Sequence, residues 1–150
     1  MARKRVKPGD IFAIPLGDDM IAAGIALHIS KYFKNGMLTG YFTECFPSIE
    51  AIDIADLRPE FAFTPNYTSK VMVGCGDWPL VGHSDALLAQ SEIPILVTVT
   101  TLLYKDEVVD QLDSIEKTRS YTVLEGQGKG YVENRLRDYF DSRRPTSQPG

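Results

Sequence analysis

The sequence offers few side chains that could do chemistry, and the densest group is the run His83-Ser84-Asp85. These are the three residue types of a serine-hydrolase triad. A triad, however, is assembled by the fold, and three adjacent residues do not have its geometry. The sequence also lacks a GxSxG segment, which would place a nucleophilic serine on a strained turn. We therefore interpret His83-Ser84-Asp85 as part of a polar loop or of a short helix.

The two thiols, Cys45 and Cys75, are the other candidate nucleophiles, and either could pair with His83. A reactive thiolate needs a cationic or helix-terminal environment, which nothing in the sequence indicates. Two cysteines are also too few for a disulfide framework. We expect both to be reduced and partly buried in a cytoplasmic protein.

Metal and phosphate sites have little support. The two histidines, His28 and His83, lie in no HxxxH, HExxH or CxxC pattern, and we interpret His28 as structural. The segment Gly126–Gly130 precedes a predicted helix and could form a phosphate-binding nest, but its GxGxG spacing is not GxGxxG. A flexible junction is the favoured interpretation. The sequence predicts no catalytic residue, no metal and no cofactor.

Charge is distributed unevenly along the 150 residues. The two ends of the chain, residues 1–7 and 135–150, hold eight of the sixteen basic residues but only two of the twenty acidic ones. The body, residues 8–134, therefore carries eight basic and eighteen acidic residues, a net charge of −10. Such a body repels nucleic acid and attracts a basic protein, unless its acids only solvate the surface. The one basic–aromatic run within it, Lys31-Tyr32-Phe33-Lys34, is a weak signal for nucleic acid. No apolar run is long enough for a membrane span, and the basic start lacks the apolar core of a signal peptide.

Strands predominate among the elements that must hold these residues. Pro8–Ala26 predicts two strands joined by a turn at Gly17-Asp18-Asp19, and Met37–Phe46 and Phe61–Tyr67 predict two more. Ile49–Leu57 is ambiguous between a short helix and an apolar loop.

The second half of the chain continues this pattern. Trp78 lies among turn-forming glycines and is expected in the core. Ile93–Tyr104 predicts one long strand, with a hairpin turn at Lys105-Asp106 into Glu107–Leu112, and Arg119–Leu124 predicts a further strand. Tyr131–Phe140 has the spacing of an amphipathic helix, whose other, solvent-facing side carries Glu133, Arg135, Arg137 and Asp138.

The predicted fold class is α+β. We expect a mostly antiparallel β structure, a bent, SH3-like or partly open barrel sheet, with a C-terminal amphipathic helix. Residues 1–7 would form a basic arm, 8–141 a single domain and 142–150 a disordered tail.

Five segments, taken in order, carry a resemblance to a known family. They are Lys7–Leu16 (KPGDIFAIPL), Met20–Ile25 with Gly24, Gly40-Tyr41-Phe42, Asp77–Gly82 with Trp78, Pro79 and Gly82, and Gly126–Phe140. Together they resemble the immunity protein 26 family of bacterial polymorphic toxin systems. The resemblance implies a cytoplasmic, non-enzymatic antidote, encoded beside a secreted or contact-delivered toxin. It implies no catalytic residues.

Our leading hypothesis is that the chain binds a cognate toxin domain and occludes its active surface, without contacting nucleic acid or membrane. The partner would be basic, as nucleases commonly are. The candidate toxin-binding residues are acidic: Asp18, Asp19, Asp106, Glu107, Asp110, Asp113 and Glu116. The alternative hypothesis is an endoribonuclease toxin with a small barrel, because the PGDIFAIPL opening is also similar to such proteins.

Overall fold

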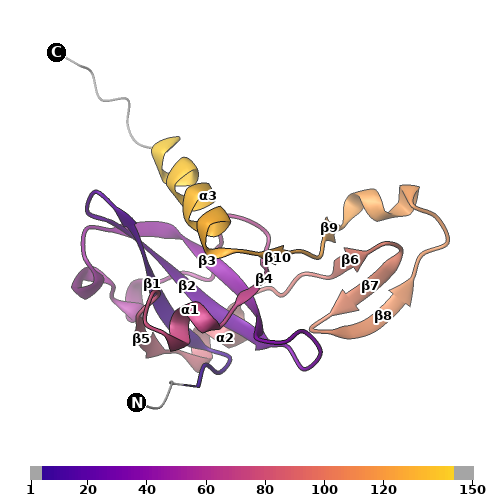
Figure 1. The fold of residues 1–150 in the computed structure, drawn as a ribbon, viewed down its shortest axis with the longest axis horizontal. Helices are drawn as coiled ribbons and strands as arrows, with labels where there is room; N and C mark the ends of the chain where they lie inside the picture. The colour runs from indigo at the N-terminus through magenta and orange to yellow at the C-terminus, as the bar shows by residue number, and fades with distance from the viewer. Residues whose placement is uncertain (1–4, 144–150) are drawn as a thin grey trace.

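In the computed structural model, which describes residues 5–143, the chain forms one large sheet and one small sheet that projects from it (Figure 1). The large sheet has the order β10-β4-β3-β2-β1-β5. Its strands are β1 (Asp10–Gly17), β2 (Met20–Ile29), β3 (Gly36–Phe46), β4 (Asn66–Ser69), β5 (Leu80–His83) and β10 (Gly126–Gln127). Every pairing is antiparallel except that of β10 with β4. The sheet stays open between its β5 and β10 edges, and the predicted α+β class with a partly open sheet is confirmed.

Both faces of the large sheet are covered, which explains why β1 and β2 are apolar almost without alternation. On one face Phe12 packs with Trp78 and with Leu136 of α3 (Lys129–Asp141). On the other face Ile11 packs with Leu87 of α2 (Asp85–Gln90), beside the 3₁₀ turns η1 (Ile49–Ala51) and η2 (Ile54–Asp56). The short helix α1 (Val71–Gly74) contributes to the first face.

The β1–β2 turn forms as predicted. Gly17, Asp18 and Asp19 all have positive φ angles, of 88°, 53° and 56°. Glycine and aspartate are among the residues that tolerate this region, so the local sequence determines the turn.

Trp78 lies wholly within the core. Its ring stacks on Phe12 with a centroid separation of 5.6 Å, and its Nε1 donates a hydrogen bond of 3.0 Å to the Glu133 carboxylate. A Cβ at Gly24 would lie 2.8 Å from the Phe12 ring, and one at Gly82 would lie 2.3 Å from Ile54. The peptide carbonyl of Pro79 accepts a hydrogen bond of 2.8 Å from the Ala13 N–H. These motif residues therefore hold the sheet together.

The small sheet was not foreseen as a separate unit. Its order is β8-β7-β6-β9, formed by β6 (Leu96–Thr98), β7 (Thr101–Tyr104), β8 (Glu107–Gln111) and β9 (Thr122–Val123), with η3 (Glu116–Ser120) before β9. The prediction of one strand over Ile93–Tyr104 is wrong, because the chain reverses at Val99-Thr100. The strand predicted over Arg119–Leu124 is reduced to β9, since η3 continues to Ser120.

Three other expectations need correction, and a fourth falls mostly outside the described residues. Strand pairing near Phe61–Tyr67 begins only at Asn66, because Pro65 cannot donate to a ladder; before it, Phe61 makes an isolated bridge with Phe42. Both cysteines are exposed rather than partly buried. Glu133, expected on the solvent face of α3, is buried because Trp78 requires an acceptor. Most of the predicted tail and arm, residues 144–150 and 1–4, lies outside the described residues, while Val6 packs into the core.

Candidate partner-binding surface

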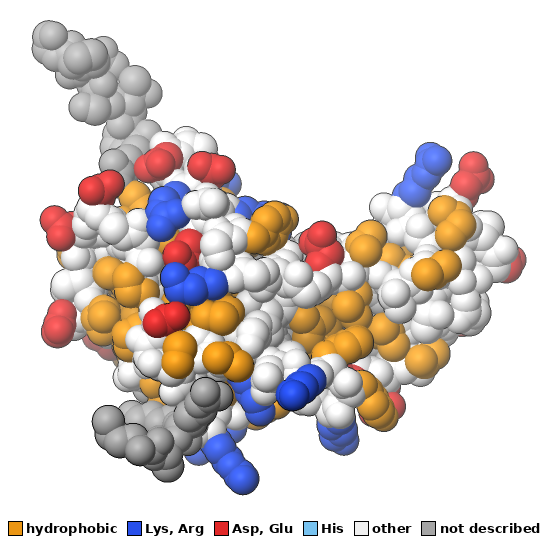
Figure 2. Space-filling model, viewed as in Figure 1, with side chains coloured by type: hydrophobic (Ala, Val, Ile, Leu, Met, Phe, Trp, Pro, Cys, Tyr) orange, Lys and Arg blue, Asp and Glu red, His pale blue; other side chains and the backbone are white. Residues whose placement is uncertain are grey.

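The small sheet and η3 form a lobe, residues 95–123, that stands away from the large sheet at one end of the molecule (Figure 1). Among the described residues, ten large hydrophobic side chains are exposed, and seven of them belong to this lobe: Ile95, Val99, Tyr104, Val108, Val109, Ile115 and Val123. Figure 2 shows apolar side chains spread over this end of the molecule. A concentration of exposed apolar groups on one small unit is typical of a binding surface.

The lobe is fixed in place by Asp106, in the β7–β8 turn. Its carboxylate accepts hydrogen bonds from the Tyr67 hydroxyl (2.5 Å) and the Lys31 N–H (2.8 Å), and it lies 3.0 Å from His28 Nε2. The side chain is only 1% exposed. Burial alone would raise the pKa of Asp106, but the hydrogen bonds from Tyr67, Lys31 and His28 outweigh burial and hold it below the ordinary value. The same burial and the Asp106 contact raise the pKa of Tyr67.

Two further residues, Asn66 and Leu96, join the lobe to the large sheet. The Asn66 side-chain amide donates 2.8 Å to the Val123 carbonyl, and its oxygen accepts from the Glu125 N–H at 2.8 Å. Leu96, at the start of β6, is 2% exposed and belongs to the core beneath the sheet. The lobe is thus anchored at its base and exposed along its outer strands.

The structure separates the acidic candidates into three groups. Four of them are exposed on the lobe, on β8 or the η3 side of it: Glu107, Asp110, Asp113 and Glu116. Asp106 is buried in the anchor just described, so its carboxylate faces the protein interior. Asp18 and Asp19 lie in the β1–β2 turn, at the opposite end of the molecule from the lobe (Figure 1). A small partner seated on the lobe would not reach that turn.

Val99, at the β6–β7 turn, has an unusual conformation. Its φ angle is +54°, and 77% of its surface is exposed. A β-branched residue with positive φ is a true conformational outlier, and glycine or asparagine would fit better. Strain of this kind is concentrated at functional sites. No signal in the sequence reveals it, because Thr98-Val99-Thr100-Thr101 contains no turn-forming residue.

The run His83-Ser84-Asp85 and the glycine-rich junction make structural contacts. His83 lies between two carboxylates, with Nδ1 2.8 Å from Asp10 and Nε2 2.6 Å from Asp85. The hydrogen bond to Asp10, which has the larger effect, and the hydrogen bond to Asp85 both raise the pKa of His83. The Ser84 hydroxyl caps α2 by accepting from the Leu87 N–H at 3.1 Å. At the junction before α3, the Gln127 carbonyl accepts from the Thr68 hydroxyl at 2.6 Å.

Within residues 5–143 there is no group of three or more histidine, cysteine or acidic side chains that could hold a metal. No helix in that range is long and apolar enough to cross a membrane.

The comparison with protein families identifies the chain. The model described as immunity protein 26 matches residues 7–107, which is 101 of the 150 residues. The class is therefore that of immunity proteins. The chain belongs to the immunity protein 26 family, and the suspected resemblance is confirmed. No curated protein and no solved structure matches it.

Proposed function

We propose that this chain protects the cytoplasm of its cell by binding a cognate toxin domain through the lobe and covering the toxin's active surface. The observation that carries the proposal is the gathering of exposed apolar side chains on the lobe. Membership of an immunity protein family implies a toxin as the partner. The toxin would be delivered by a polymorphic or contact-dependent system.

Affinity and association rate have different sources in this proposal. The apolar side chains of the lobe supply contact area, and the core of an interface is where such groups contribute most. The net charge of −10 over residues 8–134 attracts a basic toxin over distance, which raises the association rate. The exposed carboxylates on the lobe would then form the polar rim of the interface with the toxin.

A pair of matched charge variants tests the location of the interface. The double change Asp110→Asn and Asp113→Asn removes two exposed charges from the lobe. The double change Asp18→Asn and Asp19→Asn removes two from the far turn, where asparagine also tolerates positive φ. We expect the lobe variant to lower the association rate with the purified toxin domain about three- to tenfold at low salt, and the turn variant to leave it nearly unchanged. Equal effects would mean that only the net charge matters, and the lobe would lose its support.

A growth assay tests the function itself. The chain expressed alone should be harmless, and co-expression should rescue cells from the toxin, sought first as the product of the gene immediately upstream. Growth arrest with RNA decay on expression alone would favour the endoribonuclease hypothesis. His83 and Ser84 give that alternative no support, since both are held in structural contacts.

A further inference from the structure

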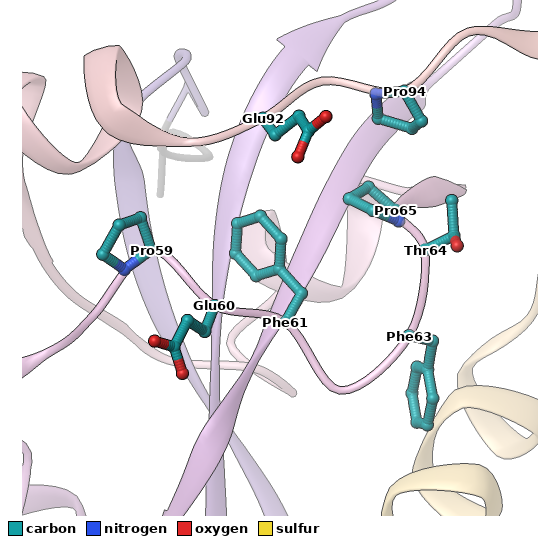
Figure 3. Close-up of a pocket in the computed structure, with 8 residues that line it drawn as sticks. All are labelled: Pro59, Glu60, Phe61, Phe63, Thr64, Pro65, Glu92 and Pro94. Atoms are coloured by element: carbon teal, nitrogen blue, oxygen red, sulfur yellow. The ribbon is translucent and has the colours of Figure 1, made fainter.

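A groove of about 530 Å³ lies between the segment 59–65 and the segment 92–94, which leads into β6 at the base of the lobe. Figure 3 shows the Phe61 ring between Pro59 and Pro65, with the Glu92 side chain on the opposite side of the groove from the ring. Nothing described so far uses this groove.

The aromatic wall of the groove is preformed. Phe61 packs against Phe42 with ring centroids 5.6 Å apart, and the two residues also form a backbone bridge. Phe61 further covers Gly40, where a Cβ would lie 2.5 Å from the ring. Prolines on either side restrict the backbone, so little conformational freedom remains to be lost on binding.

The charge of the groove has one sign. Its charged lining residues are Glu60 and Glu92, and neither takes part in the ion pairs found among the described residues. The Glu92 carboxylate faces the Phe61 ring, whereas the Glu60 carboxylate is turned away from it (Figure 3). Apolar walls with one inward-facing carboxylate suit a cation on an apolar stem.

We infer that the groove binds an arginine side chain of the partner, with its guanidinium stacked on Phe61 and paired with Glu92. A planar guanidinium can make both contacts at once, which the ammonium of lysine does less well. The chain already uses this type of contact internally, with Arg135 4.1 Å from the centre of the Phe63 ring and Arg143 3.7 Å from that of Tyr139. The inference rests on the proposed function only in naming a basic toxin as the source of the arginine.

A toxin-free experiment tests the groove directly. The probe is N-acetyl-arginine amide, its neutral isostere N-acetyl-citrulline amide is the matched comparison, and amide chemical shifts of the protein report binding. We expect millimolar binding of the arginine probe, at least fivefold tighter than citrulline, with shifts centred on Phe61 and Glu92. In Glu92→Gln the preference should disappear, and in Glu60→Gln it should be largely kept. Equal binding of both probes, or shifts elsewhere, would overturn the inference, and a lysine probe binding as tightly would overturn the choice of arginine.

The complex with the toxin domain then separates the two proposals. Glu92→Gln should weaken toxin affinity about tenfold, whereas Glu60→Gln should change it less than threefold. If Glu92→Gln weakens binding while the lobe variants do not, the groove stands and the lobe interface fails. If the lobe variants weaken binding and Glu92→Gln does not, the toxin does not use the groove, and the inference is overturned while the proposed function stands.

Discussion

Replacing Val99 with asparagine should make the isolated protein more stable and its complex with the toxin weaker. An L-residue in the left-handed region costs about 1–2 kcal/mol, with β-branched residues at the upper end, and asparagine tolerates the region better. Val99 is 77% exposed, so losing its side chain forfeits only about 0.5 kcal/mol of burial. The net gain is about 0.5–1 kcal/mol, or about 1–4 °C in Tm for a domain of this size.

The binding side of this prediction follows from the same exposure. If the toxin covers Val99, the interface loses about 1–2 kcal/mol of apolar contact, which raises Kd about 5- to 30-fold. Denaturant unfolding and calorimetric titration measure the two effects separately. Val108→Asn is the matched control, because Val108 is 65% exposed but has no positive φ. It should weaken binding without stabilising the fold. An unchanged or lowered stability of Val99→Asn would refute the strain argument, and unchanged toxin affinity would remove Val99 from the interface.

Three further changes test the fold that presents the lobe. Asp106→Asn keeps the turn but removes the charge that accepts hydrogen bonds from Tyr67 and the Lys31 N–H. It should cost about 1–2 kcal/mol of unfolding free energy and speed hydrogen exchange in β7 and β8. Because the folded-state pKa of Asp106 is lowered, the stabilisation by its carboxylate should be complete above about pH 4 and disappear as the solution is acidified further. If Asp106→Asn lowered the unfolding free energy as much at about pH 2.5 as at neutral pH, the stabilising role of the Asp106 charge would be contradicted. The pKa of His83 is raised, so its stabilisation should be complete below about pH 6.5 and fade as pH rises, which makes His83→Gln more destabilising at pH 6 than at pH 9. Leu136→Ala should cost about 2–5 kcal/mol by leaving a cavity under α3, and a loss below 1 kcal/mol in urea unfolding would show that α3 is not part of the core.

The elements that local chemistry specifies were predictable. Gly17-Asp18-Asp19 and Lys105-Asp106 form the predicted turns, with glycine and aspartate as the turn-forming types, and all five residues have positive φ angles in the structure. The apolar spacing of α3 places Val132, Leu136 and Phe140 on its buried face, as its pattern indicates. In each case a single local preference agrees with the tertiary structure.

The features that depend on distant partners were not predictable. The sequence predicts Asp106 as an exposed turn residue. Its burial depends on contacts with Tyr67 and His28, which are remote in sequence. The β6–β7 turn contradicts the local preference of Val99 and is imposed by the pairing of Leu96 with Leu103. The groove joins Phe61 to Glu92, so only the fold could bring them together. The composition of the chain was enough to identify the acidic candidates. It could not predict that the fold places some of them on the lobe and others in the β1–β2 turn at the opposite end of the molecule.

Hydrogen–deuterium exchange of the chain with and without the toxin domain tests the central claim most directly. Slower exchange on complex formation should map to residues 95–123, while the turn at Gly17-Asp18-Asp19 exchanges at the same rate in both states. A footprint centred on that turn, or none within 95–123 when the toxin is saturating, would show that the lobe does not bind the toxin.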